Sequence, residues 1–330
     1  MQKVTIERWT PESVWEGWKA NSQEIFKASE PSVSDVNLAK PIADFIAAEA
    51  NSRIAALSIL PVYTVSQPGD IKEVWKLDPD VLLGLMDTEI DICDEAKTAS
   101  WPLSSIKFEM EKHAIALPLA RQVEDNAEGL SPRKICARAC VAKLGLSVDN
   151  GFSTFLKSDT NVSGHKKTAA NWKTAASGIK GQISTAKGAV HDEVGQPMGW
   201  SLILGPTAYY SLSDWLNVNG AALGREQARN QLDVDRAHHF GTVIHREPPS
   251  ASDSSKVRLY DDEAVLAAAS ESEGDFRSWF ACAFIDAHNN FRINNWVSDS
   301  RSAWIAEVRL HIKVVSLIPK AAARFVGVNS

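Results

Sequence analysis

The chain has 330 residues, of which 44% are hydrophobic and 23% charged, and its mean hydropathy is −0.18. This composition predicts a globular protein large enough for one elaborate domain or two smaller ones. No apolar run approaches the ~18 residues of a membrane span, and no signal-peptide core follows Met1, so we expect no membrane partner and no export. The net charge of −6 argues against a dedicated nucleic-acid binder but not against a protein that encloses nucleic acid.

The first part of the chain has the pattern of two amphipathic helices, at residues 10–29 and 41–57, separated by a Pro- and Ser-containing break. Trp9, Trp15 and Trp18 crowd the first of these helices, which has little else to pack against locally. Aromatic anchors on a protruding segment favour docking onto another subunit. We therefore predict that these three side chains make inter-subunit contacts.

Two short β segments, at residues 60–65 and 71–77, flank a Gln-Pro-Gly-Asp turn. Residues 78–105 show no clean period, and alternation resumes at 106–110. A loop of about thirty residues is uncommon inside a compact domain and usually indicates function or partner contact. Trp75 and Trp101 in this region are further candidates for inter-subunit contact.

The strongest helical pattern covers residues 131–158, with Ser131 as a capping residue and Pro132 at the first helical position. Its length predicts a rod of roughly 35–40 Å, although two glycines inside it disfavour an unbroken helix. The residues of its main apolar face recur every fourth position: Cys136, Cys140, Leu144, Val148 and Phe152. Four more residues are expected to widen that same side: Ile135, Ala139, Ala142 and Leu146.

The rest of the chain mixes helices and strands, which makes the predicted fold class α+β. After a polar connector at 159–167, a helix is expected at 172–193 and a buried strand at 200–204, followed by a short helix at 209–215. Further β segments are expected at 243–244, 257–260 and 274–290. The strand at 307–314 alternates strictly, so its apolar face must be buried: Val308, Leu310, Ile312 and Val314.

The motifs that could carry chemistry are weak. The four cysteines (Cys93, Cys136, Cys140 and Cys282) indicate reduced thiols, and a metal on the Cys136/Cys140 pair is less favoured than simple burial. Lys166 stands in a Ser-x-His-Lys order known from pyridoxal-phosphate lysines, but a solvated basic turn is favoured. His238–His239 and the 261–263 carboxylates are interpreted as surface groups. We therefore expect no enzyme, no cofactor and no metal.

The order of segments resembles the major capsid proteins of tailed double-stranded DNA bacteriophages. The resemblance extends from about Val36 to Val328, and its weight lies in the order and spacing of five loose motifs. They are Ala55–Val65, Ala116–Ala127, Asn171–Ile183, Trp200–Leu212, and Val308–Val315 continued by Ala323–Val328.

The resemblance implies the tailed-phage major capsid fold. In that fold the chain would divide into an N-terminal arm (1–58), an extended β-hairpin loop (59–112), a peripheral domain (113–170), an axial domain (171–290) and return strands of the peripheral domain (291–330). The helix at 131–158 would be the spine of the peripheral domain. It also implies a structural protein that forms hexamers and pentamers in an icosahedral shell. In this fold the extended loop lies across the peripheral domain of the neighbouring subunit.

The partners that the resemblance implies are further copies of the chain, a portal protein at one vertex and a decoration protein. Because the arm pattern begins soon after Met1, we expect a separate scaffolding protein. Packaged double-stranded DNA should be held loosely, by scattered basic residues such as Arg301, Arg309 and Lys313. The protein would be assembled in the host bacterial cytoplasm and reside in the virion.

Three alternatives remain open at this stage. They are an encapsulin-type nanocompartment with the same fold, a pyridoxal-phosphate enzyme that uses Lys166, and a portal or tail protein that forms a ring.

Overall fold

The structure is a computed structural model. It describes residues 6–8, 54–77, 103–120, 122–123, 132–172, 178–195, 199–223, 232–245, 256–269, 280–287, 292–298 and 303–328. The predicted helix at 10–29 and most of the one at 41–57 lie outside these ranges, as do most of the 78–105 loop, Trp9, Trp15, Trp18 and Trp101. Residues 55–59, at the end of the second expected helix, form the short helix α3 (Ala55–Ile59).

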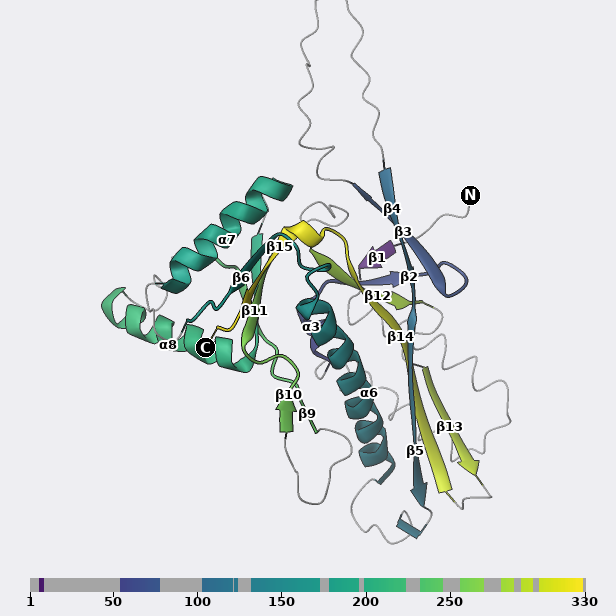
Figure 1. Cartoon of the computed structure of the whole chain (residues 1–330). Coiled ribbons are helices and arrows are strands. Elements are labelled where there is room, and N and C mark those ends of the chain that lie inside the picture. Colours follow the sequence, from purple (N-terminus) through teal and green to yellow (C-terminus); the bar gives the residue numbers. More distant parts are fainter. Residues whose placement is uncertain are drawn as a thin grey trace, which may run out of the picture.

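The larger sheet is built around β14 (Ala303–Ser316), the longest strand that the structure describes (Figure 1). On one edge β14 pairs antiparallel with β13 (Arg292–Ser298) and then with β12 (Ala281–Asp286), and β5 (Glu111–Ala120) pairs along the other edge. Beyond β12 the sheet continues with β2 (Val62–Val65), which is parallel to β12, and ends on β1 (Ile6–Arg8). This sheet forms the long axis of the molecule.

A two-stranded hairpin projects from one end of this sheet (Figure 1). β3 (Ile71–Leu77) pairs antiparallel with β4 (Leu103–Glu109), in a register that joins Ile71 to Glu109 and Leu77 to Leu103. The expected return of the chain onto its outgoing strand is therefore confirmed. β2 and β3 flank the predicted turn but do not pair with each other, because β2 joins the larger sheet instead.

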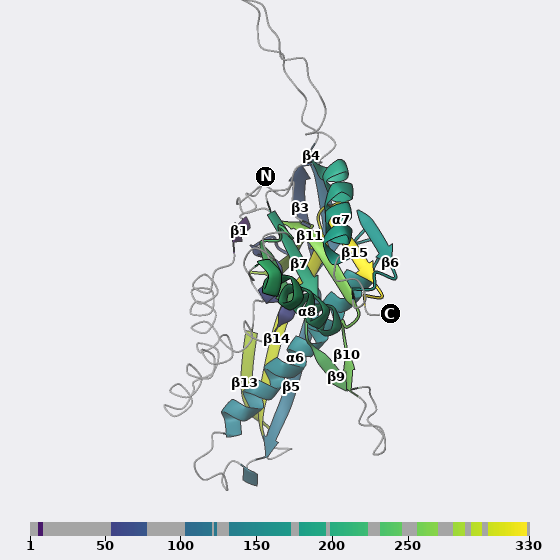
Figure 2. The same ribbon diagram turned by 90° about the vertical axis from the view of Figure 1, so that its left-hand side faces the viewer.

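Helix α6 (Pro132–Lys157) runs along β5 and β14, and the views in Figures 1 and 2 agree on this placement. It begins at Pro132, as predicted, and it is one continuous helix in spite of its two glycines. One of them has a packing reason: a Cβ on Gly145 would stand 3.2 Å from Cγ1 of Ile54, just before α3. The missing side chain lets the end of the N-terminal region approach the helix closely.

The side of α6 that faces the sheet is the one predicted from the four-residue spacing. Cys136, Cys140, Leu144, Val148 and Phe152 are all buried. The second expectation for this helix is wrong, because Ile135 is 54% exposed and Leu146 is 36% exposed. At 3.6 residues per turn these two positions lie on the side of the helix opposite the buried one, so α6 carries a second apolar stripe that faces outward.

The second sheet has the order β6-β15-β11-β7-β8 and carries two helices (Figure 1). Its strands are β6 (His165–Thr168), β15 (Ala322–Val326), β11 (Glu263–Ala269), β7 (Gly199–Leu204) and β8 (Arg236–His239). The helices are α7 (Gly178–Val194) and α8 (Pro206–Leu223), and a small separate ribbon joins β9 (Val243–His245) to β10 (Lys256–Arg258). β6 lies at the end of the polar connector, and because all four of its residues are polar it has no apolar alternation that would indicate a strand.

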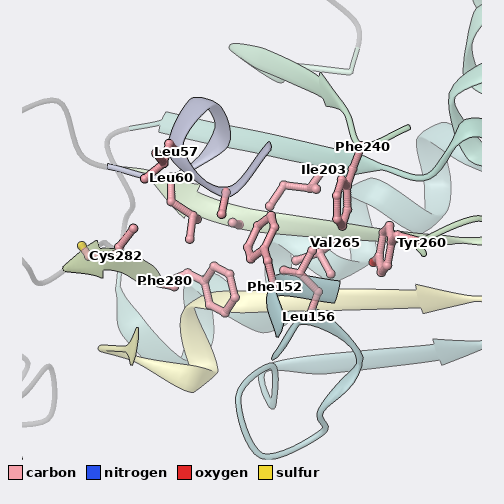
Figure 3. Packing of buried hydrophobic residues seen from close by; sticks show 14 of the residues in the cluster. Leu57, Leu60, Phe152, Leu156, Ile203, Phe240, Tyr260, Val265, Phe280 and Cys282 are labelled. Carbon is pink, nitrogen blue, oxygen red and sulfur yellow. The ribbon is translucent and has the colours of Figure 1, made fainter. Parts of the chain in front are cut away.

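The two sheets share one hydrophobic core at the C-terminal half of α6 (Figure 3). The ring of Phe152 lies 5.3 Å from that of Phe240, which in turn lies 5.7 Å from the ring of Tyr260. Val308, Leu310 and Ile312 of β14 are buried as predicted. Val314 is only partly buried, since the alternation shifts at this end of the strand and Val315 is buried instead.

Candidate functional site

The β3–β4 hairpin has two unlike faces at its root. On β3, Lys72 and Val74 point into the protein, whereas Ile71 and Trp75 point outward and are 68% and 53% exposed. The residue opposite Trp75 is Ser105, which adds little cover to the indole. The hairpin therefore presents two large apolar side chains to the outside on a well-paired pair of strands.

The inner face of the hairpin is fixed by a buried ion pair. The Lys72 ammonium, only 1% exposed, lies 3.4 Å from Oδ1 of Asp286 in β12 and donates a hydrogen bond to the carbonyl of Gln67. Beside this pair the Phe108 ring of β4 stacks on Phe284 of β12, with 5.0 Å between ring centroids. Both strands of the hairpin are thus anchored to the larger sheet at their base.

A second set of charges surrounds this anchor nearer to the surface. Asp70 accepts a hydrogen bond from Lys112, which lowers the pKa of the Asp70 carboxyl. Nδ1 of His311 lies 3.8 Å from Oδ2 of Asp286. Burial lowers the pKa of His311, and the Asp286 carboxylate opposes part of that shift. The hairpin root therefore combines a buried ion pair with a partly exposed charge cluster.

A buried carboxylate joins α6 to the end of the N-terminal region. Asp149, 1% exposed, accepts hydrogen bonds from the backbone N–H groups of Ala55 (2.9 Å) and Ala56 (3.4 Å) and from the Thr242 hydroxyl (2.7 Å). Burial raises its pKa to about 6, although these hydrogen bonds oppose the shift. Asp149 therefore holds α3, α6 and the loop after β8 together.

Of the five predicted contact residues, the structure describes only Trp75, and its exposure leaves it open to a partner. Sequence reasoning missed Ile71 as a second exposed residue on the same face, although its spacing of four from Trp75 in a strand places both on one side. It also missed Lys72 and Asp149. Nothing in the one-dimensional pattern distinguishes a buried charge whose partner is 214 residues away.

The residues considered for chemistry take structural or surface roles. Lys166 is exposed and pairs with Asp159 at 2.6 Å. Cys136 and Cys140 direct their thiols to backbone carbonyls of β5 and β14, and burial raises the pKa of Cys140 to about 12. Burial also lowers the pKa of the partly buried His238. Among the described residues no group of three or more His, Cys, Asp or Glu side chains could hold a metal ion.

Two of the basic residues expected to contact DNA are already paired with acids. Arg309 Nε lies 2.7 Å from Glu307. Lys313 pairs with Glu111, and both residues line a groove of about 280 Å³ between α6, β5 and β14. Arg301 lies outside the described residues. None of the helices described is both long and apolar enough to span a bilayer.

Comparison with known proteins gives a likeness in fold. No family model matches the chain, and no curated protein matches it. A phage-related protein from Bordetella bronchiseptica RB50 is similar with a TM-score of 0.63 at 13% identity, over 86% of this chain and 96% of that one. A virus-like particle protein from Pyrococcus furiosus has a TM-score of 0.54 at 11% identity, over 87% of this chain and 98% of that one. The capsid of Ralstonia phage GP4 has a TM-score of 0.52 at 11% identity, over 81% of this chain and 87% of that one. The chain therefore has the α+β fold of phage capsid proteins, as the order of its motifs predicts.

Proposed function

We propose that this chain is the major capsid protein of a tailed double-stranded DNA bacteriophage, which assembles as hexamers and pentamers into an icosahedral shell. The observation that carries the proposal is the capsid fold over most of the chain. It is supported by a hairpin whose base is anchored by a buried ion pair while Ile71 and Trp75 stay exposed. An anchored hairpin with an apolar outer face suits contact with a neighbouring subunit.

Within this fold the proposed division is an arm (1–58), an extended loop (59–112), a peripheral domain (113–170 with return strands 291–330) and an axial domain (171–290). The arrangement of α6 along β5 and β14 supports the role of a spine for the peripheral domain. The second sheet with α7 and α8 supports a distinct axial unit. β15 belongs to this second sheet, so the return strands serve both units.

Assembly would proceed through repeated heterologous contacts that close into a shell. Each contact can be weak, because limbs that reach several neighbours raise the effective concentration of every further contact. The protein then works by geometry and not by catalysis. Its partners would be its own copies, a separate scaffolding protein, one portal vertex, a decoration protein and packaged DNA, in a virion assembled in the host cytoplasm.

An encapsulin-type nanocompartment is the second candidate, because a shell of the same fold could enclose a cargo enzyme instead of a genome. The contents of the shell separate the two. The chain is expressed alone and together with the products of its neighbouring genes, and purified particles are imaged by negative-stain microscopy and analysed for nucleic acid and protein. Shells that package DNA support the capsid, and shells filled with one cargo enzyme support the nanocompartment. Rings or monomers under both conditions would refute the proposal.

A further inference from the structure

The outward stripe of α6 is an apolar surface on a helix whose other side is already buried. Ile135, Ala139, Ala142 and Leu146 follow one another at steps of four, three and four residues, which aligns them along the helix axis. Ile135 and Leu146 are exposed and the two alanines are partly exposed in the single chain. The stripe covers twelve residues, 135–146, and its ends are roughly 16 Å apart along the helix axis.

The edges of this stripe are basic. Lys134, Arg138 and Lys143 are exposed beside it, and the only acidic residue of α6 is Asp149, which is buried. The exposed surface of the helix is therefore positive in a protein whose net charge is −6. A partner that fits needs an apolar face of matching length flanked by acidic side chains. The apolar centre disfavours nucleic acid, whose backbone would leave that part of the stripe uncovered.

The chain itself contains a segment with this chemistry, residues 9–30, which we call the Trp-rich segment. Trp15 and Trp18 are followed by Phe26 at a helical spacing. Phe26 stands eleven positions after Trp15, as Leu146 stands eleven positions after Ile135. The segment has four glutamates and two lysines, so its net charge is opposite to that of the stripe.

The residues that link the Trp-rich segment to the described part of the chain limit how far it can extend towards an adjacent subunit. β1 ends at Arg8 and pairs with β2, and the chain is next described at Ile54, which packs against α6. Residues 9–53 join these two fixed points. The shorter connection, the seven residues from Arg8 to Trp15, can extend roughly 25 Å from β1, which lies at the edge of the larger sheet.

We propose that the stripe of α6 binds the Trp-rich segment of a second copy of this chain. The inference rests on the proposed function, because it requires neighbouring copies in a shell. It assigns an acceptor surface to the tryptophans of the N-terminal region, and it assigns the basic side chains of α6 to protein–protein contact instead of DNA.

The test is a disulfide formed in mixed shells from two differently tagged copies. One copy carries Ser22→Cys, near the middle of the Trp-rich segment, and the other carries Ala142→Cys, near the middle of the stripe, so that either direction of docking brings the two together. The control pairs Ser22→Cys with Ala189→Cys, a partly buried alanine of α7 away from the stripe. Copies with one substitution each report any background from native thiols.

The proposal predicts disulfide dimers that contain both tags, at least about tenfold more abundant than in the control. Lys143→Glu in the Ala142→Cys copy should reduce their yield about two- to fivefold, because it removes a positive charge from the edge of the stripe and adds a negative one. Shells that form normally without mixed-tag dimers overturn the inference and leave the proposed function standing. A disulfide formed only within a chain that carries Ser22→Cys and Ala142→Cys together also overturns it. If no shell forms under any condition, the proposed function fails and the inference fails with it.

Discussion

Replacing Asp149 by alanine should destabilise the subunit, because this carboxylate alone accepts hydrogen bonds from the Ala55 and Ala56 N–H groups and the Thr242 hydroxyl. Each hydrogen bond to a charged group is worth about 1.5–3 kcal/mol. Against this loss stands the relief of a buried charge. A pKa raised from 3.8 to about 6 means that, even with these hydrogen bonds in place, the charged form is disfavoured relative to the protonated form by about 3 kcal/mol at pH 7. The expected net loss for Asp149→Ala is about 2–4 kcal/mol.

The Asp149→Asn variant separates the charge from the hydrogen bonds. Its amide oxygen can still accept from the two backbone N–H groups, and its NH₂ group can donate to the Thr242 oxygen. Because it keeps these hydrogen bonds without the buried charge, its stability at pH 7 should be equal to or higher than that of the unmodified chain.

The pH dependence follows from the direction of the shift. Since the folded pKa is raised, the folded state binds the proton more tightly, and the contribution of Asp149 to stability grows as the pH falls through 6 and levels off below 3.8. Between pH 7 and pH 5 the unmodified chain should gain about 1.3 kcal/mol relative to Asp149→Asn. The assay is guanidinium unfolding of unassembled subunits at both pH values. Equal pH responses of the two proteins, or an alanine variant as stable as the unmodified chain, would refute this account of Asp149.

Three further predictions concern the hairpin and one turn. Lys72→Met should lower the free energy of subunit unfolding by about 3–5 kcal/mol, because it leaves Asp286 buried without its lysine. Adding Asp286→Leu should recover part of that stability. An unchanged stability of the Lys72→Met variant would show that the ion pair does not anchor the hairpin. Trp75→Ser should leave subunit stability within about 0.5 kcal/mol but lower the yield of shells, and unchanged yield would remove Trp75 from the interface. Gly205→Ala should destabilise the subunit by about 2 kcal/mol or more, because its Cβ would stand 2.2 Å from the Asp261 carbonyl oxygen. Gly188→Ala, in helix α7 where a Cβ would meet open space, should stabilise it by about 0.5–1 kcal/mol. Thermal unfolding of both variants tests this contrast.

The elements that could be predicted from the sequence are those with a strong local period. The start of α6 at Pro132, the buried face of α7 through Ile179 and Ile183, and most of β14 follow from such periods. β6 could not be found in this way, because its residues are polar and its partner β15 lies far along the chain.

The two apolar sides of α6 show where periodicity alone fails. Cys136 and Ile135 are neighbours in sequence and both apolar, but the helix turns them to different sides, and only the packing of β5 and β14 decides which one is buried. For the same reason the sequence identified Trp75 by residue type but not the Lys72–Asp286 pair beneath it. An ion pair between distant elements leaves no local pattern.

If this chain forms a closed shell through contacts of its arm and hairpin, the mass of the purified particles shows it most directly. Mass photometry or sedimentation velocity is performed on the chain expressed with its neighbouring gene products. The dominant species should contain many copies of the 36.0 kDa chain, and microscopy should resolve it as closed shells. A stable 36 kDa monomer as the only species would contradict it.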